Sequence, residues 1–139
     1  MGAKQIRPGS EPPEPRIAVL IPCHNERMAI ATVIGDFRAV LPEAAIYVYD
    51  NNSDDGTAEA ARAAGAIVRS EPRQGKGHVV RRMFAEIEAD IYVLVDGDAT
   101  YDAASAPDLI SDLIGNHRDM VIATPVSYTH LTLPTILLV

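Results

Sequence analysis

The stretch Ile91–Tyr101, IYVLVDGDATY, contains five β-prone residues that run directly into two carboxylates separated by one glycine. The apolar run is unbroken rather than alternating, which is typical of a parallel strand covered on both faces. We therefore expect a buried strand that ends in a site, with Asp96 and Asp98 where the chain leaves the core. Residues two apart in extended chain tend to share a face, and Gly97 allows a ligand to approach the backbone closely.

Paired carboxylates at a strand end favour a hard divalent cation. Mg2+ takes one or two protein carboxylates and completes its shell with water and phosphate oxygens. The alternative interpretation is an ordinary Asp-Gly turn whose acids are exposed for solubility.

Composition limits the rest. The chain has 139 residues, of which 47% are hydrophobic, and this suits one globular domain with a real core. The net charge of −7 argues against nucleic acid as a partner, because phosphates demand a basic surface. Cys23 is the single cysteine, so an internal disulfide and a cysteine-based zinc site are both excluded and a reducing, cytoplasmic location is expected.

Strand and helix patterns alternate along the chain. Buried strands are predicted at Ile17–Ile21, Ala45–Tyr49, Ala66–Arg69, Ile91–Val95 and Met120–Ala123, and Pro22 is predicted to end the first. Between them, apolar residues at helical spacing predict helices over about 30–41, 79–87 and 109–114, and a short Ala-rich helix ends at Gly65. Met83 and Phe84 are assigned to the core.

The two ends of the chain differ from its middle. Residues 1–16 are rich in proline, glycine and charge and are predicted to be a disordered leader, not a signal peptide. From Val126 onward the string VSYTHL resembles one reading frame of a sequencing-library transposon adapter. Residues 126–139 are therefore predicted to be a non-native tail, and residues 17–125 to be the functional part of a longer protein.

Alternating strands and helices predict an α/β fold, with a Rossmann-like parallel sheet and flanking helices. In such sheets the carboxyl ends of all strands share one edge, where ligands bind. Polar clusters follow three of the strands, at Cys23–Glu26, Asp50–Thr57 and Asp96–Asp98. Their convergence favours a site over the ordinary turn.

In order and spacing, these clusters resemble the family 2 glycosyltransferases of GT-A fold. The resemblance rests on Ile-Pro-Cys-His-Asn-Glu, Asp-Asn-Asn-Ser-Asp-Asp-Gly-Thr, Gly75-Lys76-Gly77 and Asp96-Gly97-Asp98, and covers about residues 17–124. Within the family the chain is similar to dolichyl-phosphate mannose synthase and bacterial polyprenyl-phosphate hexose synthases. It departs from the family at His24, where tyrosine is common, and at Asn51, where a second acid is frequent.

The resemblance implies a role for each cluster. Asp96 and Asp98 would hold Mg2+ or Mn2+ on the diphosphate, and Asp98 is the expected catalytic residue. The expected nucleotide-sugar site comprises Pro22, His24, Asn25, Glu26, Asp50, Asn51, Asn52, Lys76, Asp96, Gly97 and Asp98. The Gly75-Lys76-Gly77 segment is not a Walker A loop, because the upstream glycine and the following Ser or Thr are missing.

The implied reaction moves a hexose from a UDP- or GDP-sugar to a polyprenyl phosphate, with inversion, in cell-envelope synthesis at the inner face of the membrane. A metal on the diphosphate stabilises the charge that develops there. No general base is identifiable before residue 125, and a phosphate monoester with a second pKa of about 6 needs none. The full-length protein is expected to associate peripherally with the membrane, and this truncated chain is expected to be inactive alone.

Two alternatives remain open from the sequence. Asp96-Gly97-Asp98-Ala99-Thr100 also matches the nucleophile motif of haloacid-dehalogenase-like phosphohydrolases, in which Asp96 would attack phosphate. That motif normally follows the first strand, whereas three predicted strands precede it here. The other alternative is a non-catalytic nucleotide-sugar-binding fragment.

Overall fold

The computed structural model describes residues 14–99, 101–123 and 136–138. The elements follow the predicted alternation of strand and helix. They are β1 (Ile17–Cys23), α1 (Arg27–Val40), β2 (Ala45–Asp50), α2 (Thr57–Ala63), β3 (Ile67–Ser70), α3 (Lys76–Glu86), β4 (Ile91–Leu94), the 3-10 turn η1 (Ala103–Ser105), α4 (Ala106–Gly115), β5 (Val121–Ala123) and β6 (Ile136–Leu138).

The strands form one sheet in the order β3-β2-β1-β4-β6-β5. β1 pairs in parallel with both β2 and β4, and β2 pairs in parallel with β3, as the sequence predicted. β6 is antiparallel to β4 and to β5. Its residues lie in the predicted tail, so the expectation that the sheet stops after a fifth strand was wrong.

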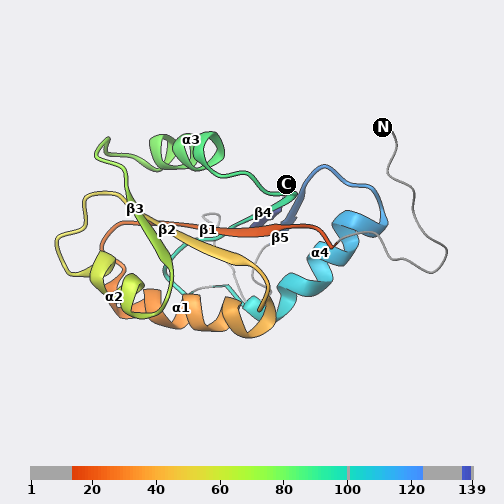
Figure 1. Ribbon diagram of the computed structural model, residues 1–139, viewed down its shortest axis with the longest axis horizontal. Coiled ribbons are helices and arrows are strands. Elements are labelled where there is room, and N and C mark those ends of the chain that lie inside the picture. The colour runs from red at the N-terminus through yellow and green to blue at the C-terminus, as the bar shows by residue number, and fades with distance from the viewer. Residues whose placement is uncertain (1–13, 100, 124–135, 139) are drawn as a thin grey trace, which may run out of the picture.

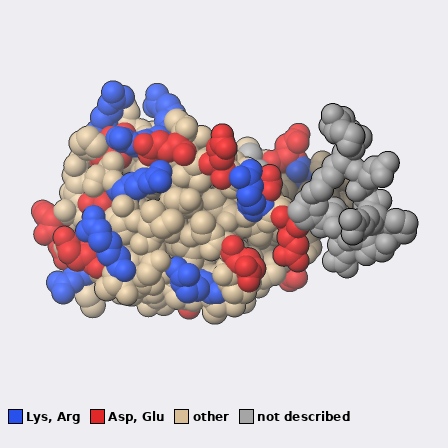
Figure 2. Space-filling view, viewed as in Figure 1, with Lys and Arg blue, Asp and Glu red and all other residues tan. Residues whose placement is uncertain are grey.

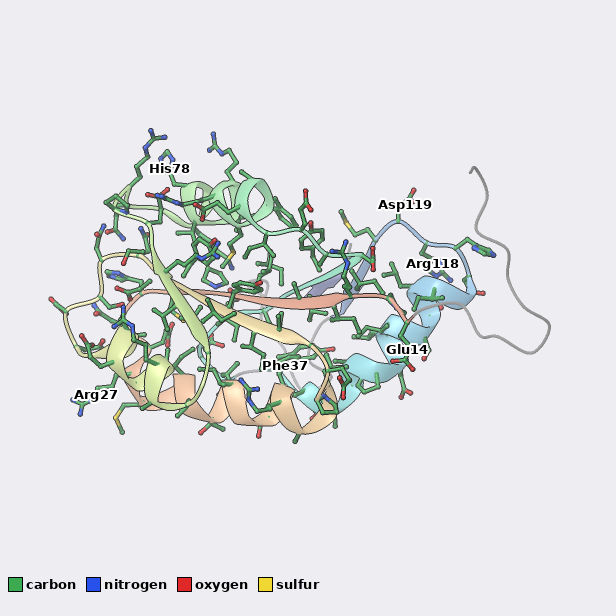
Figure 3. The ribbon with its side chains drawn as sticks, viewed as in Figure 1. Glu14, Arg27, Phe37, His78, Arg118 and Asp119 are labelled. Carbon is green, nitrogen blue, oxygen red and sulfur yellow. The ribbon has the colours of Figure 1, made fainter. Side chains whose placement is uncertain are left out.

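Helices cover both faces of the sheet. α1, α2 and α4 lie on one face and α3 lies on the other (Figure 1). The larger core cluster joins α1 and α4 to the sheet, and Phe37 points from α1 into it (Figure 3). A smaller cluster joins Val79 and Met83 of α3 to the opposite face. β4 is covered on both faces, as its unbroken apolar run predicted. Val93 belongs to the larger cluster and Tyr92 packs against the smaller one.

Pro22 does not end the first strand. It lies inside β1 in register with Tyr49 of β2. Leu20 O accepts from Val95 N on the β4 side and Cys23 O accepts from Asn51 N on the β2 side. Because backbone groups alternate sides, the missing Pro22 donor faces β4, whose pairing with β1 ends at Leu20. No ladder bond is lost.

The core assignment held for Met83, which is fully buried, but not for Phe84. Phe84 is 37% exposed and packs edge-on against Tyr92, with ring centroids 5.1 Å apart. Gly65 follows α2 with φ of +94°, which supports its predicted role at the helix end.

The charged surface is mixed in sign on the face shown in Figure 2, where acidic and basic side chains are interspersed. Among the described helices, none is long and apolar enough to cross a bilayer. Residues 1–13 of the predicted leader and residues 126–135 and 139 of the predicted tail lie outside the described part of the chain.

Candidate active site

The loops that follow β1, β2 and β4 meet at one edge of the sheet, as the parallel topology requires. They enclose, together with the start of α3, a pocket of about 340 Å³. Its lining comprises Pro22, Cys23, His24, Glu26, Asn51, Gln74, Gly75, Lys76, Val79, Asp96, Gly97 and Asp98. The three polar clusters that are far apart in sequence therefore do converge.

The Asp96-Gly97-Asp98 segment is a turn rather than extended chain, because β4 ends at Leu94. The two carboxylates thus do not share a strand face as predicted, although both line the pocket. Gly97 is buried beneath the β1 loop. A Cβ at this position would lie 2.6 Å from Cys23 Sγ and 3.4 Å from Glu26 Cγ, so only glycine fits.

Three carboxylates and one ammonium group face the pocket. Lys76 Nζ forms an ion pair with Asp96 Oδ1. The pKa of Glu26 is raised, first by burial and then by the charges of Asp98 and Asp96. The pocket therefore carries an excess of negative charge.

The carboxylates fit a hard cation that shares its shell with a ligand. Among the described residues, no group of three or more His, Cys, Asp or Glu side chains is arranged to hold a metal. Asp96 and Asp98 alone match the one or two carboxylates that Mg2+ takes from a protein when substrate phosphates supply further oxygens. A complete metal cage of protein side chains is not built here.

Cys23 is a packing residue. Its side chain is buried, and burial, followed by the nearby carboxylates, raises the pKa of its thiol. Since the thiolate is the nucleophilic form, this environment disfavours a nucleophilic role for Cys23, the last residue of β1.

The loop after β2 caps the start of α1. The backbone N–H of Asn25 donates to Ser53 Oγ at 2.8 Å, that of Glu26 to Thr57 Oγ1 at 3.0 Å and that of Arg27 to Asp55 Oδ2 at 3.2 Å. The helix has no cap from its own N-cap side chain. The sequence predicted capping residues in this loop but did not predict that they would serve α1, 28 to 31 residues away.

Replacing Asp55 with alanine is expected to lower the melting temperature by a few degrees at pH 7, because Arg27 N–H and Thr57 lose their acceptor. The Thr57 hydroxyl hydrogen bond, ahead of other causes, lowers the pKa of Asp55. Its stabilisation is therefore present above the pKa of an unfolded aspartate and is lost as pH falls through the lower folded value.

Asp54→Ala is the matched control, since it removes the same charge from an exposed neighbouring side chain. Thermal melts of both variants from pH 7 to pH 3 should show a deficit for Asp55→Ala alone, and that deficit should shrink in acid. Equal melts for the two variants would contradict the capping role.

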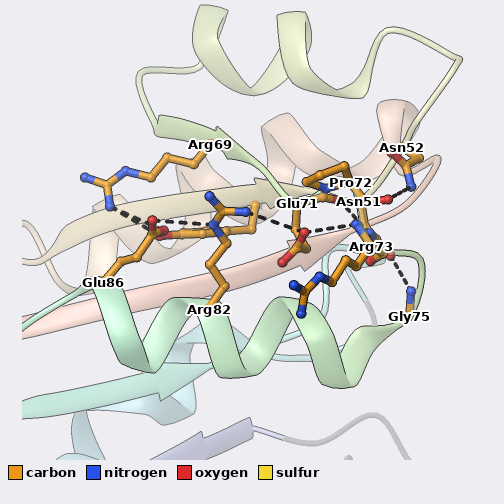
Figure 4. A network of polar contacts seen from close by, with 10 residues as sticks. Asn51, Asn52, Arg69, Glu71, Pro72, Arg73, Gly75, Arg82 and Glu86 are labelled. Carbon is orange, nitrogen blue, oxygen red and sulfur yellow. Dashed lines mark hydrogen bonds and ion pairs between the residues drawn. The ribbon is translucent and has the colours of Figure 1, made fainter.

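Asn51 and Asn52 bind the loop that leads into α3. Asn51 Nδ2 donates to the carbonyl oxygens of Glu71 and Arg73 at 2.7 Å each, and its Oδ1 accepts from Gly75 N–H at 2.9 Å (Figure 4). Asn52 Nδ2 donates to Pro72 O at 2.9 Å. An aspartate at position 51 could accept from Gly75 but could not donate to the two carbonyls, which explains the amide found here.

His24 lines the pocket and contacts the backbone just after β2. Its Nδ1–H donates to the carbonyl oxygen of Asn51 at 2.6 Å, which fixes the ring's orientation. Asp50, the last residue of β2, is 8% exposed, and its Oδ2 accepts a hydrogen bond from Ser53 N–H at 3.3 Å. Within the described residues, Asp50 Oδ1 is buried without a hydrogen-bond partner.

Most predicted site residues line the pocket, and three do not. Asn25, Asp50 and Asn52 are absent from its lining and contact the surrounding loops. Four further residues line the pocket that were not among the predicted site residues: Cys23, Gln74, Gly75 and Val79. The glycine pair around Lys76 was the only signal that could have indicated this wall.

Comparison with known proteins gives a consistent result. The family model described as glycosyl transferase family 2 matches residues 18–136. Protein RfbJ of Shigella flexneri is 61% identical over 106 residues, which are 76% of this chain and 82% of RfbJ. A dolichyl-phosphate hexose transferase of Haloferax volcanii is 33% identical over 76% of this chain and 46% of its own length.

Solved structures agree. Glucosyl-3-phosphoglycerate synthase from Mycobacterium tuberculosis, crystallised with Mn2+, UDP and phosphoglyceric acid, matches with a TM-score of 0.65 and 30% identity, over 71% of this chain and 39% of that one. The chain thus spans less than half of this synthase and of the archaeal transferase. The match decides against the phosphohydrolase alternative and confirms the GT-A fold: the chain belongs to glycosyltransferase family 2.

Proposed function

We propose that this chain forms the donor half of a metal-dependent, inverting hexosyltransferase that uses a UDP- or GDP-sugar and transfers the sugar to a polyprenyl phosphate. The observation that carries the proposal is the meeting of Lys76, Asp96 and Asp98 in one pocket at the carboxyl edge of the sheet. The synthase crystallised with Mn2+ and UDP supports the choice of metal and donor. The dolichyl-phosphate hexose transferase supports the acceptor class.

Asp96 and Asp98 would hold Mg2+ or Mn2+. When bound, the metal supplies Lewis-acid stabilisation of the charge that develops on the leaving nucleoside diphosphate. Lys76 stands at the first position of α3, where backbone N–H groups at the helix start also favour an anion. These groups would bind and orient the diphosphate.

Residues along β1 and β2 would bind the nucleoside. Pro22 and His24 line the adjacent wall, and the buried Asp50 Oδ1 lacks a donor among the described residues. Uracil and guanine both carry N–H groups that can donate a hydrogen bond to such an oxygen. The Asn25 backbone, through Ser53, and the Asn52 side chain, through Pro72, would support this wall.

The acceptor would attack the anomeric carbon from the face opposite the diphosphate, which inverts that centre. A polyprenyl phosphate is largely ionised at neutral pH, because the second pKa of a phosphate monoester is about 6. The chain would then need no general base of its own. A lipid-phosphate acceptor would place the reaction at the membrane surface.

Titration calorimetry with UDP, GDP, UMP and GMP tests the proposal. At least one diphosphate is expected to bind in the presence of Mn2+ and to lose most of its affinity when the metal is chelated. The monophosphates are expected to bind weakly under both conditions, because each offers only one phosphate to the metal. A diphosphate affinity that is the same with and without metal would overturn the proposal.

A further inference from the structure

Lys76 and Asp96 contact each other across the pocket, although 20 residues separate them in sequence. Their side chains are 59% and 30% exposed, so the ion pair lies at the open mouth rather than in the core. Among the residues that line the pocket, Lys76 is the only lysine or arginine, whereas Glu26, Asp96 and Asp98 are acidic. The ammonium group therefore partly compensates a negative site.

The backbone that carries Lys76 is held in place on two sides. The Asn51 side chain fixes the preceding loop through Glu71, Arg73 and Gly75. Further along α3, Arg82 forms ion pairs with the buried Glu71 at 3.5 Å and with Glu86 at 3.4 Å (Figure 4). The position of the Lys76 backbone is thus set by contacts that do not involve the donor.

Glu86 extends this network to the sheet. It accepts a hydrogen bond from Tyr49 Oη of β2 at 2.6 Å, and Arg69 of β3 donates to the same hydroxyl at 3.2 Å. The start of α3 is thus connected to β2 and β3, whereas the Lys76 side chain is 59% exposed and has room to move to another partner.

Asp96, which Lys76 contacts through Oδ1, is also one of the two carboxylates that would hold the metal. An ammonium group and a divalent cation held by the same carboxylate would repel each other at short range. The ammonium must leave when a metal arrives. The diphosphate that accompanies the metal supplies the nearest new anion for it.

We propose that Lys76 is an exchangeable internal counter-ion, which holds Asp96 while the pocket is empty and moves to the diphosphate when metal and nucleotide bind together. This inference rests on the proposed function. It makes the binding of metal and nucleotide cooperative: metal alone must displace Lys76 without giving it a new partner, whereas a nucleotide that binds with the metal provides one.

The variant Lys76→Met tests the inference by an effect of opposite sign on two ligands. Mn2+ alone, followed by electron paramagnetic resonance, is expected to bind about two- to fivefold tighter than to the wild-type chain, since an exposed ion pair no longer competes. UDP or GDP at saturating Mn2+ is expected to bind several-fold more weakly. Lys76→Arg keeps the charge and should show no gain in Mn2+ affinity.

Arg81→Met is the matched control, because it removes one charge from an exposed position on the same helix outside the pocket lining. A similar gain in Arg81→Met would attribute the effect to net charge and overturn the inference. Mn2+ affinity that is unchanged or weaker in Lys76→Met, with wild-type binding intact, would overturn the inference alone. Failure of the wild-type chain to bind Mn2+, with or without nucleotide, would overturn the proposed function as well.

Discussion

The variant Asp98→Asn is expected to lose Mn2+-dependent binding of the nucleoside diphosphate by about 100-fold or more. Changes to residues that only support a metal ligand already cost 10- to 100-fold in affinity, so loss of a direct carboxylate ligand should cost at least as much. Asp98 is exposed at the mouth of the pocket, and the substitution keeps its size, so the fold should be preserved. Calorimetry with and without Mn2+ measures the effect.

Asp119→Asn is the control for this experiment. It makes the same change of charge at an exposed position far from the pocket, at the other end of the molecule (Figure 3). Its nucleotide affinity should equal that of the wild-type chain. If Asp98→Asn also retained full metal-dependent affinity, the assignment of the metal to the Asp96–Asp98 turn would fall.

Gly97→Ala is expected to destabilise the chain by about 1–3 kcal/mol and to abolish nucleotide binding, because an added methyl group would overpack the turn. The new Cβ would meet Cys23 Sγ at 2.6 Å, whereas its next neighbours, Glu26 Cγ and Ile21 Cγ2, lie at 3.4 and 3.5 Å. The thiol is therefore the main obstacle. Removing it should restore most of the lost room.

The double variant Cys23→Ala with Gly97→Ala tests this directly. Its free energy of unfolding, measured with denaturant, should exceed that of Gly97→Ala alone, although Cys23→Ala by itself removes a buried atom and should lower stability slightly. Metal-dependent nucleotide binding should return in parallel. Strictly additive losses in the two variants would show that the glycine is required for another reason.

The order of elements could be predicted from the sequence because each depends on local pattern. The apolar spacing of Ile30, Val33, Ile34 and Phe37 specified α1, and all four are buried. The unbroken run before Asp96 predicted a strand covered on both faces, which is observed. β6 was missed because its residues lie in the segment 126–139, which was predicted to be a non-native tail, so no strand was sought there.

The site could be predicted only as far as parallel topology brings loops together. Which side chain contacts which loop depends on partners distant in sequence, as for Asn51 with Glu71 and Lys76 with Asp96. Asn51 lines the pocket, as its place in the pattern predicted, and its amide also binds the loop before α3, which the pattern did not indicate. Asp50 and Asn25, which the sequence also assigned to the nucleotide-sugar site, are not among the residues that line the pocket.

The cap that Ser53, Asp55 and Thr57 provide also determines how the site opens. Proteins unfold locally in cooperative units, and a helix start capped by a distant loop belongs to the same unit as that loop. When the 53–57 segment detaches, the amides of Asn25, Glu26 and Arg27 lose their acceptors together. The β1 and β2 sides of the pocket are therefore expected to open together rather than separately.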